Sequence, residues 1–350
     1  MTDLLHSLVA RTRPVDTETW DDFWDRLQRK ELHTGEALAV ISSLSTRMPD
    51  ARTVAAFLTS LEGRRAQAPA PWPGTVNVVG TGGGPATFNL TTASVLVAAA
   101  MDVKVVKTGS RGYRSRFGSL DILERLGVPT AASYAECEDL LDAYGIAFAG
   151  GFVYPAELTR LARAILPYGM KQVGRIVNVL GPFLAAAPVS VRLTGVSDAA
   201  LFPRLAEVAD ALPERDIWLI RNELGVDELV SFAENTIRTG PAQAPLRIAP
   251  GSMDGMRLDG GSLDDLLPVY EDESPVGQLL ALLGGEGPAA AVQSICLNAA
   301  AAAVASGART QWADAYSAAE KAMFDGAAVE LVDRLRRHRR ASRRQVAGVG

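Results

Sequence analysis

The stretch VVGTGGGPATFNLTT, residues 78–92, decides how the rest of the chain is interpreted. Two valines lead into four glycines, Gly80, Gly82, Gly83 and Gly84, and then into hydroxyl-bearing residues. A strand that ends in glycines before a helix leaves backbone N–H groups free at the helix start, where the helix dipole favours negative charge. The stretch indicates either a phosphate-binding loop or an ordinary surface turn, and it fits neither the G-x-G-x-x-G nor the Walker pattern.

The overall composition is that of a globular protein with one large or two modest domains. Of its 350 residues, 48% are hydrophobic and 21% charged, and the net charge of −5 gives no overall attraction for nucleic acid or anionic membranes. Two cysteines without a C-x-x-C spacing argue against a disulfide framework or a zinc site and fit a reducing cytoplasm. The first residues lack the pattern of a signal peptide, and we expect the Ala-rich stretch 289–305 to be a buried helix.

The first part of the chain has a helical texture that changes after residue 70. Apolar residues recur at three- and four-residue spacing up to residue 66, and AQAPAPWPG, residues 66–74, is the best linker candidate. We therefore expect a small helical domain at 1–70, joined by helices from about 153–185, and an α/β domain at 71–350.

Short β-branched segments alternate with helical ones in the second part. The expected strands are residues 75–80, 103–109, 146–150, 189–195 and 216–222, and helices are expected between them. Strand–helix alternation of this kind predicts an α/β fold with a mainly parallel sheet.

Two further segments change the interpretation of the glycine loop. KTGSRGYRSRFGS, residues 107–119, supplies basic residues at the end of the second strand, and adjacent parallel strands end at the same crevice. GVDEL, residues 225–229, places Asp227 and Glu228 after another strand. Paired carboxylates beside phosphates suit Mg²⁺. Either segment alone is more often a solvated loop.

These segments, in this order and spacing, resemble those of anthranilate phosphoribosyltransferases. Residues 80–92 are similar to the family's GTGGDG…TFN loop, and residues 107–121 to its KHGN…GS loop. Residues 177–183 are similar to its FNLLGP segment, and residues 225–229 to its GLDE motif. Residues 285–307 also resemble the family's closing helices. The resemblance implies the nucleoside phosphorylase/phosphoribosyltransferase fold, with a helical domain hinged to an α/β domain. It also implies a homodimer that binds phosphoribosyl diphosphate (PRPP) with Mg²⁺ in its cleft.

Position by position, the resemblance assigns residues to two kinds of contact. It implies PRPP-binding roles for Gly80, Gly83, Thr87, Asn89, Thr91, Thr92, Lys107, Arg111, Ser115 and Ser119. It implies metal-binding roles for Thr91, Asp227 and Glu228. Displacement of diphosphate builds up a ribosyl cation and a leaving anion. Charge stabilisation by Lys107, Arg111 and the metal is therefore expected instead of a protein nucleophile.

The acceptor side departs from the family pattern. The family's His and Asn in KHGN correspond to Thr108 and Ser110, and its carboxylate-binding Arg corresponds to Tyr168. We expect these three residues to contact the acceptor, and the acceptor to be an aromatic or heterocyclic molecule other than anthranilate.

Two alternatives stay open. One is an anthranilate phosphoribosyltransferase of tryptophan biosynthesis with a repacked pocket. The other is a non-catalytic protein of the same shape that binds nucleic acid through RLRRHRRASRR, residues 334–344. A solvated helix end is the more common role for such a stretch, so nucleic acid is not an expected partner.

Overall fold

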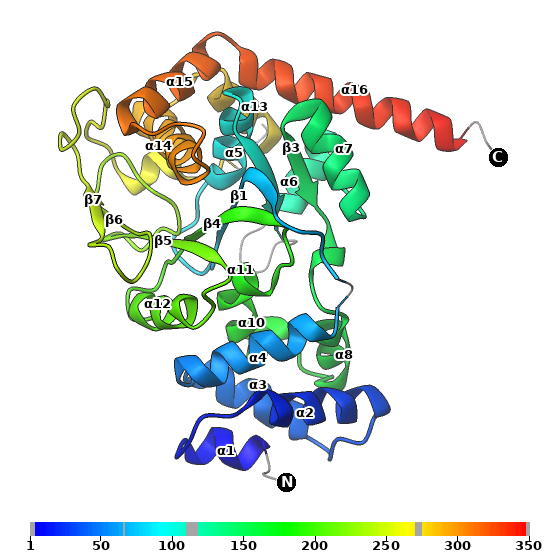
Figure 1. The fold of residues 1–350 in the computed structure, drawn as a ribbon. Helices are drawn as coiled ribbons and strands as arrows, with labels where there is room; N and C mark the ends of the chain where they lie inside the picture. Colours follow the sequence, from blue (N-terminus) through cyan, green and yellow to red (C-terminus); the bar gives the residue numbers. More distant parts are fainter. Residues whose placement is uncertain (1–3, 66, 110–117, 270–274, 348–350) are drawn as a thin grey trace. The chain divides into compact units, whose positions relative to one another are not determined.

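The structure, a computed structural model, describes residues 4–65, 67–109, 118–269 and 275–347 and divides the chain into two compact units (Figure 1). Unit 1 is built from three segments, Met1–Ala68, Phe152–Ala186 and Ala200–Arg215. Unit 2 takes the rest of the chain, Pro69–Gly151, Ala187–Ala199 and Asp216–Gly350. The segment Ala200–Arg215, which carries a helix of unit 1, was not assigned to the helical part by the sequence analysis.

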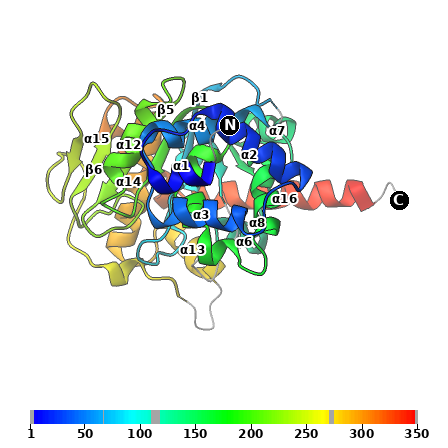
Figure 2. The same ribbon diagram turned by 90° about the horizontal axis from the view of Figure 1, so that it is seen from below.

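Unit 1 is helical. Its N-terminal segment forms four helices that gather together in Figure 2, namely α1 (Leu4–Ala10), α2 (Thr17–Arg29), α3 (Glu36–Thr46) and α4 (Ala51–Gly63). The later segments add α8 (Ala156–Ala164), α9 (Met170–Val173), α10 (Arg175–Val179), α11 (Gly181–Leu184) and α12 (Phe202–Asp210). Of these, α10 packs on α3, while α11 and α12 pack on α4.

An aromatic cluster forms the core of unit 1. Trp20, Phe23 and Trp24 project from one face of α2, and Phe57 projects from α4. All four side chains are buried, and the rings of Trp20 and Phe57 meet edge to face with 5.0 Å between their centroids. The three- and four-residue spacing of apolar positions in the sequence therefore marks the buried faces of these helices.

The described residues of unit 2 form a seven-stranded sheet with the order β3-β2-β1-β4-β5-β6-β7. Its strands are β1 (Trp72–Gly80), β2 (Lys104–Thr108), β3 (Ile146–Ala149), β4 (Val189–Gly195), β5 (Asp216–Asn222), β6 (Asn235–Arg238) and β7 (Leu246–Ile248). The first five run parallel, β6 is antiparallel to β5, and β7 is antiparallel to β6. The predicted α/β class with a mainly parallel sheet is confirmed, and β6 and β7 are strands that the sequence analysis missed.

The helices of unit 2 connect and cover this sheet. They are α5 (Leu90–Ala100), α6 (Ser119–Leu126), α7 (Tyr134–Tyr144), α13 (Pro275–Leu283), α14 (Ala289–Ala305), α15 (Trp312–Phe324) and α16 (Ala327–Ala347), with the short 3₁₀ helices η1 (Gly151–Val153) and η2 (Leu263–Leu266). The Ala-rich α14 packs on α5 and is buried along most of its length, as predicted. Among the described helices, none is both long and apolar enough to cross a membrane.

The predicted linker at 66–74 extends too far. Residues 72–74 already belong to β1, and Trp72 N donates to Pro188 O at 2.9 Å. The register of β1 against β4 shifts between Trp72 and Val76. This irregularity accommodates Pro73, because a proline cannot donate to a regular strand ladder.

Candidate active site at the carboxyl edge of the sheet

Four neighbouring parallel strands end at one edge of unit 2. In the order β2, β1, β4 and β5, they end at Thr108, Gly80, Gly195 and Asn222. Because parallel strands share their direction, the glycine loop, Lys107 and the loop that carries Asp227 and Glu228 all lie at this edge.

Asp227 reaches across from the end of β5 to the glycine loop. Its Oδ2 accepts a hydrogen bond from Gly82 N at 2.7 Å. An ideal Cβ on Gly80 would lie 2.0 Å from the same oxygen, and one on Gly195 would lie 1.7 Å from Asp227 O. Both glycines are therefore required because the Asp227 loop comes too close for any side chain. For Gly80, this requirement is distinct from the predicted contact with PRPP.

Glu228 is buried beside the first turn of α5. Thr91 Oγ1 donates to Glu228 Oε1 at 2.8 Å, whereas no described residue donates a hydrogen bond to Glu228 Oε2. Burial raises the pKa of Glu228, and the neighbouring Asp227 carboxylate raises it further. Burial also raises the pKa of Asp227, partly offset by the hydrogen bond from Gly82. Two adjacent carboxylates in this setting require a cation to be stable in the charged form.

Lys107 supplies positive charge from the buried end of β2. Its Nζ donates to Val78 O at 3.2 Å. Burial lowers the pKa of Lys107 to about 8, although Glu228 and Asp227 both act to raise it. The lysine therefore lies within electrostatic reach of both carboxylates.

The start of α5 provides backbone donors at the same edge. Asn89, the residue before the helix, has a left-handed conformation with φ 34° and ψ 40°, and its side chain does not cap the helix. Gly83 also has positive φ, at 90°. Thr87 is partly exposed, whereas the side chain of Thr92 is buried. In the neighbouring loop Ser119 begins α6, and an ideal Cβ on Gly109 would lie 2.1 Å from its Oγ.

The predicted acceptor residues fall in two different units and partly outside the described residues, so each is considered by itself. Thr108 is fully buried and its Oγ1 lies 3.1 Å from Asn77 Nδ2, so its hydroxyl is already engaged. Tyr168 belongs to unit 1 and is 48% exposed. Ser110 lies outside the described residues, as do the predicted PRPP residues Arg111 and Ser115. The acceptor roles of these residues stay predictions.

Several residues that shape the site were missed. Besides Gly195, Ser197 follows β4, and its Oγ donates to Gly82 O at 2.7 Å. Asn222 ends β5 and its side chain holds the Asp227 loop through four hydrogen bonds. Only the position of these residues at or near the ends of predicted strands could have indicated a role.

The donor set fits Mg²⁺ bound together with phosphates. The described residues contain no cluster of three or more His, Cys, Asp or Glu side chains placed to hold a metal. The protein would instead supply two carboxylates and one hydroxyl, all hard oxygen ligands, and the partnerless Glu228 Oε2 leaves a lone pair available. Mg²⁺ is typically held by one or two carboxylates, water and substrate phosphates.

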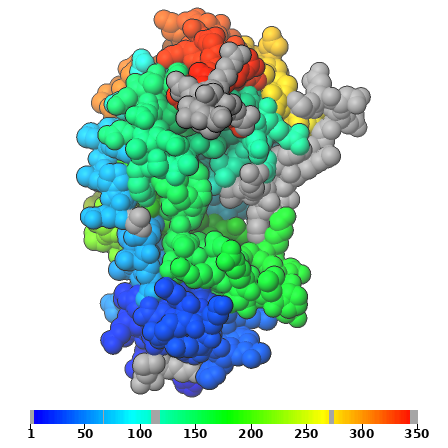
Figure 3. All heavy atoms as spheres, turned by 90° about the vertical axis from the view of Figure 1, so that its right-hand side faces the viewer, coloured from blue at the N-terminus to red at the C-terminus, as the bar shows by residue number. Residues whose placement is uncertain are grey.

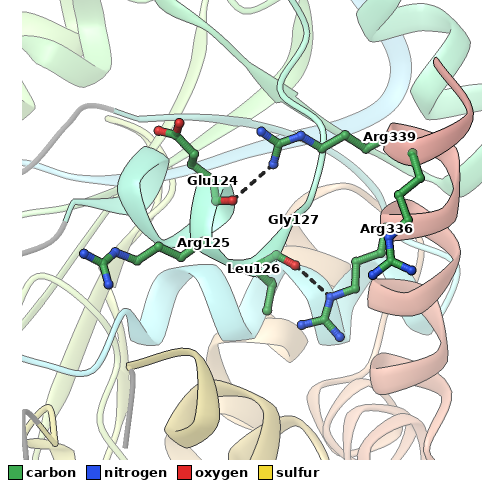
Figure 4. A pocket seen from close by; sticks show the side chains of 7 residues that line it. Glu124, Arg125, Leu126, Gly127, Arg336 and Arg339 are labelled. Atoms are coloured by element: carbon green, nitrogen blue, oxygen red, sulfur yellow. Dashed lines mark hydrogen bonds between the residues drawn. The ribbon is translucent and has the colours of Figure 1, made fainter. Parts of the chain in front are cut away.

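The basic stretch of α16 contacts the end of α6 in the same unit. Arg336 Nε donates to Leu126 O at 2.7 Å, and Arg339 Nη1 donates to Glu124 O at 3.2 Å (Figure 4). Cations at a helix C-terminus are favoured by the carbonyl groups and by the helix dipole. These two arginines therefore act as a cap for α6.

The same stretch also contacts α7. Arg334 Nη2 donates to Ala143 O at 3.1 Å, and its guanidinium lies 5.3 Å from the centre of the Tyr144 ring. Figure 3 shows the red atoms of α16 against the green part of unit 2. An open pocket of about 650 Å³ remains there, lined by Glu124, Arg125, Leu126, Gly127, Arg336, Arg339 and Arg340. Three of the arginines at 334–344 are thus engaged within the protein, which weakens the case for a nucleic-acid-binding tail.

Comparison with known proteins assigns the chain to a glycosyl transferase family. Residues 73–329 match the family described as the glycosyl transferase family, a/b domain, and this stretch contains all the site residues named above. The chain is 31% identical to the anthranilate phosphoribosyltransferase of Geobacillus kaustophilus over 75% of its own length and 76% of the relative's. It is 30% identical to that of Shouchella clausii over 82% and 83%. The chain belongs to the anthranilate phosphoribosyltransferase family, and it is an enzyme of the phosphoribosyltransferase class.

Solved structures show the same fold. The anthranilate phosphoribosyltransferase of Thermus thermophilus superposes with a TM-score of 0.81 at 24% identity, covering 97% of this chain and 100% of that one. The Saccharomyces cerevisiae enzyme in complex with PRPP and Mg superposes with a TM-score of 0.76 at 21% identity, covering 96% and 97%. The predicted family and fold are therefore confirmed.

Proposed function

We propose that this protein transfers the 5-phosphoribosyl group of PRPP to an aromatic or heterocyclic acceptor other than anthranilate, with Mg²⁺. The observation that carries the proposal is the contact between the glycine loop and Asp227, beside Glu228 and within electrostatic reach of Lys107. The yeast relative solved with PRPP and Mg supports the same donor and metal.

The residues of the site have separate roles in this reaction. Asp227, Glu228 and Thr91 would hold the metal, which when bound neutralises the departing diphosphate. The N–H groups at the start of α5 would bind phosphate oxygens, because they lack partners inside the helix and lie at its positive end. Lys107 would add positive charge beside the leaving group, and the buried strand ends would keep water away from the ribosyl cation.

The proposed acceptor is inferred from three positions of the sequence. Thr108, Ser110 and Tyr168 stand where the family has an acceptor-binding His, Asn and Arg. That change supports an acceptor without a carboxylate, since an Arg fork suits a carboxylate better than a phenol does. Anthranilate itself is the competing acceptor. The relatives named above are anthranilate phosphoribosyltransferases, and they support anthranilate as much as the sequence changes support another acceptor.

The donor half can be tested by ligand-induced stabilisation. A ligand that binds only the folded state raises its melting temperature by mass action. PRPP with Mg²⁺ should therefore raise the melting temperature of the parent protein, and Asp227→Asn should reduce that rise. Glu223→Gln is the matched control, because Glu223 is an exposed carboxylate in the same loop. Absence of any PRPP effect on the parent would refute the proposal.

The proposal includes a cytoplasmic homodimer, as the family resemblance implies. Light scattering of the purified chain would test the dimer. Nucleic acid is not part of the proposal.

A further inference from the structure

The loop that carries the two carboxylates is held by asparagine side chains. We define the acidic loop as residues 223–231, the first part of the connection from β5 to β6. Among the described residues 224–231, a single backbone–backbone hydrogen bond is present: Gly225 N donates to Asn222 O at 3.5 Å. Such a loop would ordinarily be mobile, because its backbone groups have no ladder or helix to satisfy them.

Asn222 binds the first half of the acidic loop. Its Oδ1 accepts from Leu224 N at 3.0 Å and from Val226 N at 3.2 Å. Its Nδ2 donates to Val226 O at 2.9 Å and to Glu228 O at 2.6 Å. The side chain is only 3% exposed, so these bonds form away from competing water.

Asn298, on α14, binds the residue directly after Glu228. Its Oδ1 accepts from Leu229 N at 3.0 Å, and its Nδ2 donates to Leu229 O at 2.7 Å. Asn235 makes the same pair of bonds with Val230, at 2.9 and 2.8 Å. Asn298 and Asn235 are each 1% exposed.

Only a side-chain amide can make these contacts. Each asparagine accepts from an N–H group and donates to a carbonyl with one planar group, whereas an aspartate lacks the donors and a leucine lacks both. The carboxylates need this support, because two buried neighbouring charges would otherwise separate by moving the loop toward water. The hydrogen bonds on both sides of Glu228 oppose that movement.

We propose that Asn222 and Asn298 are positioning residues that hold Asp227 and Glu228 in a metal-binding arrangement before any ligand arrives. The inference rests on the proposed function, since it concerns the metal of that site. Groups that orient the ligands of a metal typically change its affinity roughly 10–100-fold when they are removed.

The test compares Asn222→Ala and Asn298→Ala with Gln293→Ala. Gln293 is the matched control, because it is a buried amide on the same α14 but binds Asp259, through Asp259 N and Asp259 Oδ2, and not the acidic loop. Mn²⁺ affinity would be measured by electron paramagnetic resonance in the presence of inorganic diphosphate. The Mg²⁺ concentration for half-maximal turnover gives a second readout. A merely structural defect would reduce the amount of folded enzyme without changing this concentration.

We expect both asparagine variants to need roughly tenfold or more metal for half-saturation, and the Gln293 variant to stay within about twofold of the parent. Metal affinities of the asparagine variants that match the control would overturn the inference while leaving the proposed function intact. A parent protein that binds no Mn²⁺ with diphosphate would overturn both.

A measurement on the parent protein tests the inference even if the variants fail to fold. Amide hydrogen exchange without ligand should show Val226, Leu229 and Val230 protected at least about 100-fold more than the exposed Gly83, since buried hydrogen bonds limit exchange to local opening. Equal exchange rates would overturn the inference even if no variant could be purified.

Discussion

Replacing Gly80 with alanine should disable the site, because the new methyl group would occupy the position of the Asp227 carboxylate. An ideal Cβ there lies 2.0 Å from Asp227 Oδ2 and 2.5 Å from its Cγ. Non-bonded carbon atoms pack at about 3.5–4.0 Å. The strand cannot retreat, because Gly80 is paired in register with Gly195 of β4. The carboxylate must therefore rotate away.

The cost of this movement can be worked out from its contacts. Asp227 would lose the 2.7 Å hydrogen bond from Gly82 N, a charge-assisted bond worth about 1.5–3 kcal/mol. A strained side-chain rotamer adds about 0.5–1.5 kcal/mol. The free energy of unfolding should fall by roughly 2–4.5 kcal/mol, and the melting temperature of this 350-residue chain by roughly 3–6 °C. Displacing a charged group of the site by about 1 Å should reduce kcat/KM about 100-fold.

The assay combines thermal melting with diphosphate release from PRPP. Gly240→Ala serves as the control, since an added Cβ there meets no atom within 4 Å. Asp227→Ala should lower the melting temperature of the parent but lower it less, or raise it, in the Gly80→Ala background, where the hydrogen bond is already lost and the substitution removes the clash. A Gly80→Ala protein that melts within about 1 °C of the parent and keeps most of its activity would refute the reasoning.

Four further outcomes are expected. Turnover of anthranilate should have a kcat/KM below about 10⁴ M⁻¹s⁻¹, the lower end of the usual enzyme range. A panel of neutral aromatic acceptors should contain a better substrate. Efficient anthranilate turnover would instead identify an enzyme of tryptophan biosynthesis with a repacked pocket. EDTA should abolish the PRPP-induced rise in melting temperature and excess Mg²⁺ should restore it, whereas a rise that survives chelation would argue against the metal. Burial raises the pKa of the Cys137 thiol to about 12 and that of the Cys296 thiol above its usual range. Ellman's reagent at about pH 8 should therefore label neither thiol before urea is added. Fast labelling of the native protein would contradict the burial of these thiols. Arg336→Ala should cost about 0.5–1.5 kcal/mol by removing the bond to Leu126 O, while the exposed Arg337→Ala should be neutral within about 0.5 kcal/mol; equal melting temperatures would contradict the capping role.

Local patterns in the sequence were sufficient to predict much of the fold. The β-branched segments of β1 to β5 and the glycines at residues 80–84 are recognisable in short windows. The order of the motifs then placed Lys107, Asp227 and Glu228 at one edge of the sheet. The antiparallel β6 and β7 were missed because they are short and lack a strong alternating pattern.

Contacts between distant residues could not be predicted in this way. Asn298 binds Leu229 across 69 positions in the sequence, and no local pattern near either residue predicts this contact. Thr108 corresponds in sequence to an acceptor-binding residue of the family, yet its hydroxyl is turned toward Asn77 inside the sheet. In both cases the direction of a side chain decides its role, and that direction depends on the assembled sheet.

The segmented construction of unit 1 has a consequence during synthesis. Its first helices are complete at Ala68, but α12 belongs to a segment that ends at Arg215. At about 5–20 residues per second, the ribosome needs roughly 7–30 s to make the intervening chain. Throughout that time the surface of α4 that later meets α12 is uncovered, and the surfaces of α3 and α4 that meet α10 and α11 are uncovered for most of it. An N-terminal fragment that stops before residue 215 would remain in this exposed state, and it should aggregate where the full chain folds.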